Sequence, residues 1–135
     1  MKVTFVSLSA VLLLLAGPGV GLAEDLKDKV KFEAESGGLP PGMEPGMYVC
    51  AGGHLHIQGR VQNLAEVTLG RIKVAGRAFG ADDKLLGTAT ATTRVDTLRP
   101  GEYAAVDLEF VSVTGPKINQ VKRHEVAVIE APRKR

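Results

Sequence analysis

Apolar and polar residues alternate in short segments along most of this chain. The segment from His54 to Gln62 places Leu55, Ile57 and Val61 on one face and polar side chains on the other. Later segments repeat this period of two and are separated by glycine, proline and aspartate residues typical of turns. A period of two indicates a half-buried strand, and short strands between turns are typical of sandwiches and barrels. The sequence therefore predicts an all-β, antiparallel β-sandwich of about seven strands.

The expected strands cover most of the chain after residue 28. They are Lys29 to Glu35, Met47 to Ala51, His54 to Gln62, Arg71 to Phe79, Leu85 to Val95, Tyr103 to Val111, and Ile118 to Ile129 in one or two parts. Besides the three residues above, the expected inward set is Ile72, Val74, Ala78, Leu85, Gly87, Ala89, Ala91, Val106, Leu108 and Phe110. The small residues predict that the two sheets approach closely where they occur; they are Gly59, Gly76, Gly87, Ala89 and Ala91.

The first 23 residues have the features of a secretory signal peptide. A positive charge at Lys2 precedes an uncharged apolar stretch, which Pro18 and Gly19 interrupt, and Gly21 and Ala23 supply small residues before the expected cleavage point. The apolar stretch is shorter than the ~20 residues that span a bilayer. We therefore expect cleavage, no membrane span afterwards, and a periplasmic or extracellular location.

The remaining chain of about 110 residues has the length of one domain. We expect an N-terminal strand and a Pro/Gly-rich loop over residues 24–46, the sandwich over 47–131 and a solvated basic tail over 132–135. The formal net charge of the whole chain is only +2. A nearly neutral chain gives no basis for nucleic-acid binding, which requires a strongly basic surface.

Cys50 is the only cysteine, so the chain cannot form an internal disulfide. We expect the side chain to be buried as a small apolar group; pairing with another chain and a reactive thiol are the alternatives. Ser36 and Ser112 lie in no nucleophile motif, and Asp82 and Asp83 fall in a predicted turn. The sequence therefore predicts a protein that is not an enzyme and has no cofactor.

Several short motifs resemble the FxLYD domain family. Gly59-Arg60-Val61-Gln62-Asn63 is similar to its G-x-V-x-N motif, and Leu98-Arg99-Pro100-Gly101-Glu102 is similar to its L-x-P-G-E corner. At the position of the naming motif, only Phe79 keeps the aromatic character. The resemblance implies an immunoglobulin-like fold in an exported protein, with no shared catalytic residues. It implies structural roles for Gly59, Asn63, Pro100 and Gly101.

His54 and His56 share one face of their predicted strand, ~6–7 Å apart along the chain. Such a pair can supply two ligands to Zn²⁺ or Cu²⁺, because imidazole suits both ions. A metal site requires a third ligand. His124, Cys50, Asp107 and Glu109 are conceivable third ligands, although the sequence alone places none of them near the pair. The alternative is that both histidines occupy the solvent face of the strand.

Two functional hypotheses follow. The leading one is an exported, non-catalytic binding or scaffold module that docks on an envelope or extracellular protein. The loop from Gly37 to Gly46 and the edge strand before it would form its contact surface, because strand edges accept added strands. The alternative is an exported Cu/Zn-binding protein that uses His54 and His56.

Overall fold

The computed structural model describes residues 25–35 and 44–135. The expected signal peptide and most of the Pro/Gly-rich loop lie outside the described residues. The strands are β1 (Val30–Ala34), β2 (Met47–Val49), β3 (His54–Asn63), β4 (Lys73–Phe79), β5 (Leu85–Thr92), β6 (Tyr103–Thr114) and β7 (Arg123–Glu130). Three short 3₁₀ turns accompany them: η1 (Lys27–Lys29), η2 (Ala81–Asp83) and η3 (Gly115–Gln120).

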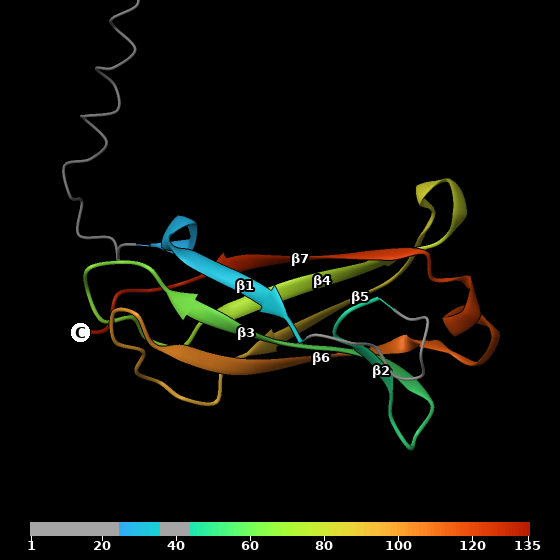
Figure 1. Cartoon of the computed structure of the whole chain (residues 1–135), viewed down its shortest axis with the longest axis horizontal. Helices are drawn as coiled ribbons and strands as arrows, with labels where there is room; N and C mark the ends of the chain where they lie inside the picture. The colour runs from blue at the N-terminus through green and yellow to red at the C-terminus, as the bar shows by residue number, and fades with distance from the viewer. Residues whose placement is uncertain (1–24, 36–43) are drawn as a thin grey trace, which may run out of the picture.

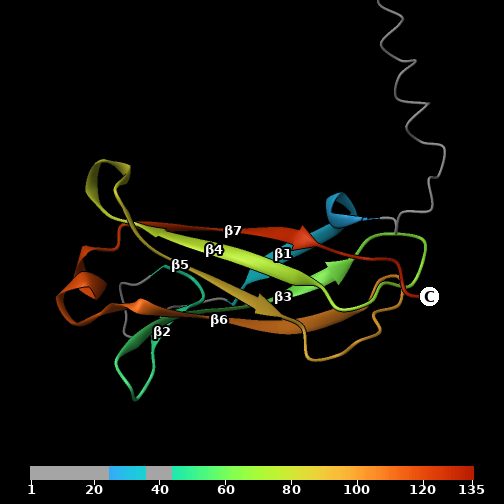
Figure 2. The same cartoon turned by 180° about the vertical axis from the view of Figure 1, so that it is seen from behind.

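The strands form two antiparallel sheets that face each other (Figures 1 and 2). In the larger sheet, β6 pairs with one edge of β3. On the other edge of β3, β1 pairs with Gly59–Asn63 and β2 pairs with Leu55–Ile57. The smaller sheet has the order β5-β4-β7. The predicted all-β sandwich of about seven strands is therefore confirmed.

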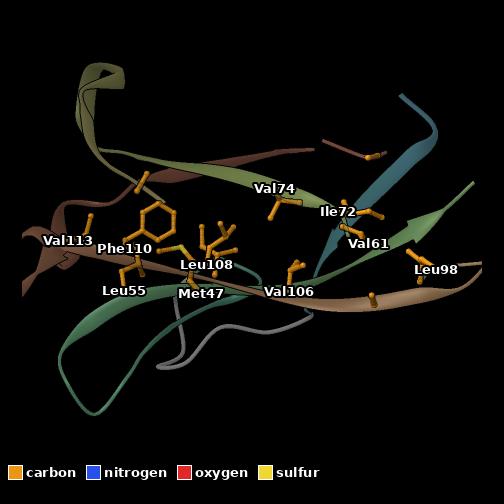
Figure 3. Close-up of a cluster of buried hydrophobic side chains, with 14 of the residues drawn as sticks. Met47, Leu55, Val61, Ile72, Val74, Leu98, Val106, Leu108, Phe110 and Val113 are labelled. Atoms are coloured by element: carbon orange, nitrogen blue, oxygen red, sulfur yellow. The ribbon is translucent and has the colours of Figure 1, made fainter. Parts of the chain in front are cut away.

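The core lies between the two sheets, where Figure 3 shows apolar side chains from both layers. The residues of β3, β4 and β6 that were predicted to point inward are buried. They are Leu55, Ile57, Val61, Val74, Ala78, Val106, Leu108 and Phe110, together with Ile72, which precedes β4. Because their polar neighbours alternate with them, each strand turns its other face outward.

The prediction that Leu85 points inward is wrong. Leu85 is 50% exposed, whereas the neighbouring Leu86 is buried. Ala78 pairs with Gly87 and Phe79 pairs with Leu85, so one extra residue is inserted into β5 at this point. Such a β-bulge reverses the alternation at the start of the strand. The inward set that begins at Gly87 is unaffected, and Ala89 packs against the core.

Both ends of the described chain are tied into the sandwich. Val30 and Phe32 of β1 pack against the core. The backbone N–H of Leu26 donates to the carbonyl of Ala131 at 2.9 Å, and Pro132 forms a bridge to Asp25. These contacts make β1 and the C-terminal residues part of the sandwich itself.

Gly59 allows β1 and its aromatic side chain to lie directly against β3. A Cβ at Gly59 would overlap the carbonyl oxygen of Glu33 and would lie 2.6 Å from the Phe32 ring. This contact lies within the larger sheet. The predicted close approach of the two sheets is present at Gly76, where a Cβ would lie 3.0 Å from the Phe110 ring.

The corner at Arg99 to Glu102 is a turn with the expected glycine geometry. The Glu102 N–H donates to the Arg99 carbonyl at 3.0 Å, and Gly101 has a φ of +85°. A side chain at this φ is strained.

Gly101→Ala is therefore expected to lower the free energy of unfolding by about 1 kcal/mol. Gly70→Ala is the matched control, because a Cβ at Gly70 would make only ordinary contacts, at 3.7 Å from Pro132. Urea unfolding of the two variants measures the difference. Equal stability of the two variants would contradict the strain at Gly101.

Candidate metal centre

Polar side chains from three strands meet on the outer face of the larger sheet. His54 and His56 alternate with the buried Leu55 and Ile57, so both histidines point away from the core. The register pairs His56 with Tyr48 of β2 on one side and with Glu109 of β6 on the other. Tyr48, His56 and Glu109 therefore form one row across the sheet.

The β2–β3 hairpin brings Cys50 to the end of this row. The Gly53 N–H donates to the Cys50 carbonyl at 2.9 Å, and the Cys50 N–H donates to the His54 carbonyl at 3.1 Å. Gly53 has a φ of +83°, which glycine adopts without strain. The connection between β2 and β3 projects below the sandwich in Figure 1. Its turn places Cys50 Sγ 3.8 Å from His54 Nδ1.

Cys50, His56 and Glu109 each offer one ligand atom, and these three atoms lie within 4.8 Å of one another. Glu109 Oε2 is 3.8 Å from His56 Nε2 and 2.9 Å from His54 Nδ1. In a tetrahedral zinc site with bonds of about 2.0–2.3 Å, neighbouring ligand atoms lie roughly 3.3–3.7 Å apart. The ligand atoms of Cys50, His56 and Glu109 therefore lie close enough to share one ion after a small inward adjustment. His54 Nδ1 contacts Glu109 and Cys50 from beside this group of three.

The His56 ring is held in one orientation by Asp107 and Tyr48. His56 Nδ1 lies 2.8 Å from Asp107 Oδ1, and the Tyr48 hydroxyl donates to Asp107 Oδ2 at 2.5 Å. The Tyr48 ring stacks on His56 with a centroid distance of 4.7 Å. Because a carboxylate only accepts, Nδ1 carries a proton, and in the neutral ring Nε2 keeps its lone pair. Against the opposing effect of burial, the hydrogen bonds with Asp107 and Cys50 raise the pKa of His56.

His56 Nε2 is buried and has no hydrogen-bond partner in the described part of the chain. A buried polar atom without a partner costs about 1–3 kcal/mol, so it calls for a partner such as an ordered water or a bound ion. Among the described residues, His124 Nδ1 is the other atom of this kind. At His56, the lone pair is directed to the side of the ring on which Glu109 lies. A carboxylate that orients a histidine whose other nitrogen is free is the usual outer shell of a zinc ligand.

The local hydrogen bonds favour a thiolate at Cys50. The backbone N–H of His54 lowers the pKa of Cys50 to about 7, against the opposing effect of burial and with further help from His56. The thiolate is the form that binds metals. Burial and the hydrogen bond to Asp107 raise the pKa of Tyr48 to about 12, so Tyr48 stays protonated as a donor.

The structure places the predicted site residues in different ways. His54 and His56 share one face as predicted, with Cys50 and Glu109 beside them and Asp107 behind the His56 ring. The His56 side chain is only 12% exposed, so it does not lie free in solvent. The prediction of a buried, apolar Cys50 is wrong, because its half-exposed side chain contacts His54.

His124 does not join this group. Its Nε2 lies 3.2 Å from the Pro45 carbonyl oxygen and 3.7 Å from Glu44. Tyr48 was missed from the sequence. The expected strand from Met47 would have put Tyr48 on the outer face, but its pairing with His56 depends on the hairpin register.

No known protein family, curated protein or solved structure matches this chain. In residues 25–35 and 44–135, no helix has the length and apolar character needed to cross a membrane.

Proposed function

We propose that this chain binds one zinc or copper ion through Cys50, His56 and Glu109, with His54 as the fourth ligand. The buried Nε2 of His56, which lacks a hydrogen-bond partner, is the observation that carries the proposal. An ion pair between His54 and Glu109 accounts for those two side chains without a metal. It leaves His56 Nε2 unexplained, whereas a bound ion would satisfy it.

The donor set selects the class of ion. A thiolate and two imidazoles are borderline-to-soft ligands that suit Zn²⁺ and copper, whereas Mg²⁺ and Ca²⁺ prefer sites made of oxygen ligands. Glu109 is the only oxygen donor in the proposed set. We therefore expect Mg²⁺ and Ca²⁺ to bind weakly at this site.

Export, the resemblance to the FxLYD family and an immunoglobulin-like topology stay predictions. Docking on an envelope or extracellular protein is the second candidate function. Among the described strands, β1 pairs only with β3, so its other edge is free to accept a strand from a partner. Docking and metal binding would use different surfaces and are compatible.

Metal titration of the reduced, metal-free protein tests the proposal. We expect one Zn²⁺ per chain and a rise in melting temperature. At a free Zn²⁺ concentration 100 times Kd, binding adds about 2.7 kcal/mol to the free energy of unfolding. Mg²⁺ should give no shift, and His124→Gln should bind Zn²⁺ like the wild type because His124 lies outside the site.

The absence of stoichiometric Zn²⁺ and copper binding would overturn the proposal. Zinc binding that is lost in His124→Gln and kept in His56→Gln would also overturn it, because the ion would then occupy a different site.

A further inference from the structure

Cys50, His56 and Asp107 are arranged as a nucleophile, a base and the group that orients the base. Asp107 Oδ1 lies 2.8 Å from His56 Nδ1, which leaves Nε2 as the ring nitrogen able to take up a proton. The ligand atoms of Cys50 and His56 lie within 4.8 Å of each other. Cys50 Sγ is hydrogen-bonded to His54 Nδ1, at 3.8 Å, but that nitrogen also lies 2.9 Å from Glu109 Oε2, a carboxylate that can only accept from it. His56 Nε2 is therefore the ring nitrogen left to act as a base, and a cysteine beside an oriented base is activated for attack on an electrophile.

We propose that, in the metal-free protein, Cys50 is a site of thiol–disulfide exchange with small disulfides, and that a mixed disulfide and a bound ion exclude each other. The mutual exclusion of the mixed disulfide and the ion rests on the proposed function. The exclusion follows because a sulfur joined to another sulfur is no longer the thiolate that binds a metal. Oxidation of the site would therefore release the ion.

The exchange balances without any further reactant. The Cys50 proton moves to His56 Nε2, and the Cys50 sulfur attacks one sulfur of the disulfide. The disulfide bond breaks as the new S–S bond forms, and the leaving thiolate takes the proton back from His56. The products are one mixed disulfide at Cys50 and one free thiol.

The surroundings of Cys50 fit a small disulfide. The side chain is half-exposed at the tip of the hairpin, and a Cβ at the neighbouring Gly53 would meet nothing within 4 Å. The chain has no second cysteine that could resolve the mixed disulfide, so the modified form should accumulate. Glu109, which is nearby and 47% exposed, disfavours anionic disulfides. A neutral probe, 2-hydroxyethyl disulfide, is therefore appropriate.

The test follows the mass gain of the reduced, metal-free protein with 2-hydroxyethyl disulfide at neutral pH. His56→Gln is expected to react roughly fivefold more slowly than the wild type, because its thiol lacks the base. His124→Gln should react like the wild type. Saturating Zn²⁺ should slow the wild-type reaction at least tenfold, which also supplies a readout that does not depend on a variant.

Each outcome decides one part of the proposal. Equal rates for the wild type and folded His56→Gln would overturn the exchange mechanism. A slow rate in His54→Gln alone would do the same, because His54 Nδ1 lies 3.8 Å from Cys50 Sγ and would then be the base. Zinc that binds without slowing the reaction would overturn the exclusion. Rapid exchange in a protein that binds no metal would refute the proposed function and leave the exchange standing.

Discussion

Asn63→Ala is expected to lower the free energy of unfolding by about 3 kcal/mol and the melting temperature by roughly 10–15 °C. The Asn63 side chain is fully buried at the end of β3. Its amide donates to the carbonyl oxygens of Val67 at 3.0 Å and Leu98 at 2.9 Å, and its Oδ1 accepts from the Ala65 N–H at 2.8 Å. Alanine removes all three hydrogen bonds and leaves buried backbone groups without these partners.

Thermal and urea unfolding measure the effect, with Asn119→Ala as the matched control. Asn119 is exposed in η3, so its replacement should change stability by less than about 0.5 kcal/mol. Asn63→Asp should be at least as harmful as Asn63→Ala, because a carboxylate cannot donate to the two carbonyl oxygens and is costly to bury. An Asn63→Asp protein as stable as the wild type would contradict this role of the Asn63 hydrogen bonds.

The fold was predictable because the strands of this chain are half-buried. In β3, and in β6 as far as Phe110, every second residue enters the core. The polar residue between Leu55 and Ile57 therefore marks the outer face directly, as does the one between Leu108 and Phe110. The corner was equally local. Pro100 and Gly101 specify their own turn, and Asn63 has the short amide side chain that bonds nearby backbone.

The failure at Leu85 has a physical cause that the sequence does not contain. Leu85 and Leu86 are both apolar, so either can fill the core position. The choice is made by the bulge opposite Phe79, which depends on how β4 and β5 pair. Alternation predicts a face only when polar neighbours mark the other face, and that condition fails at a pair of leucines.

The candidate site was predictable only in part, because most of its contacts also depend on how the strands pair. His54 and His56 share a strand, so their common face follows from the period of two. Asp107 lies 51 residues from His56 along the chain, and only the register of β3 against β6 places the two together. Cys50 is closer to the two histidines along the sequence, but its position depends on the tight β2–β3 connection that returns it to His54.

His56→Gln is expected to weaken Zn²⁺ binding by roughly a hundredfold or more. Structural zinc sites gain about 10–16 kcal/mol from four ligands, so one ligand contributes on the order of 3 kcal/mol. Asp107→Asn should weaken binding only about tenfold, because asparagine can still accept a hydrogen bond from His56 Nδ1 but lacks the negative charge that makes Nε2 a better donor to the metal. Competition titrations with a zinc-binding dye measure both affinities.

The ratio between the two variants separates a metal site from a simple charge cluster. If the acidic side chains only attracted cations to the surface, Asp107→Asn would remove one charge and would weaken binding at least as much as His56→Gln. Glu125→Gln is the matched control for a lost carboxylate, because Glu125 lies on β7 of the other sheet and pairs with Arg77 and Arg123. Its affinity for Zn²⁺ should equal that of the wild type. A larger loss in Asp107→Asn than in His56→Gln would therefore place the ion away from His56 Nε2.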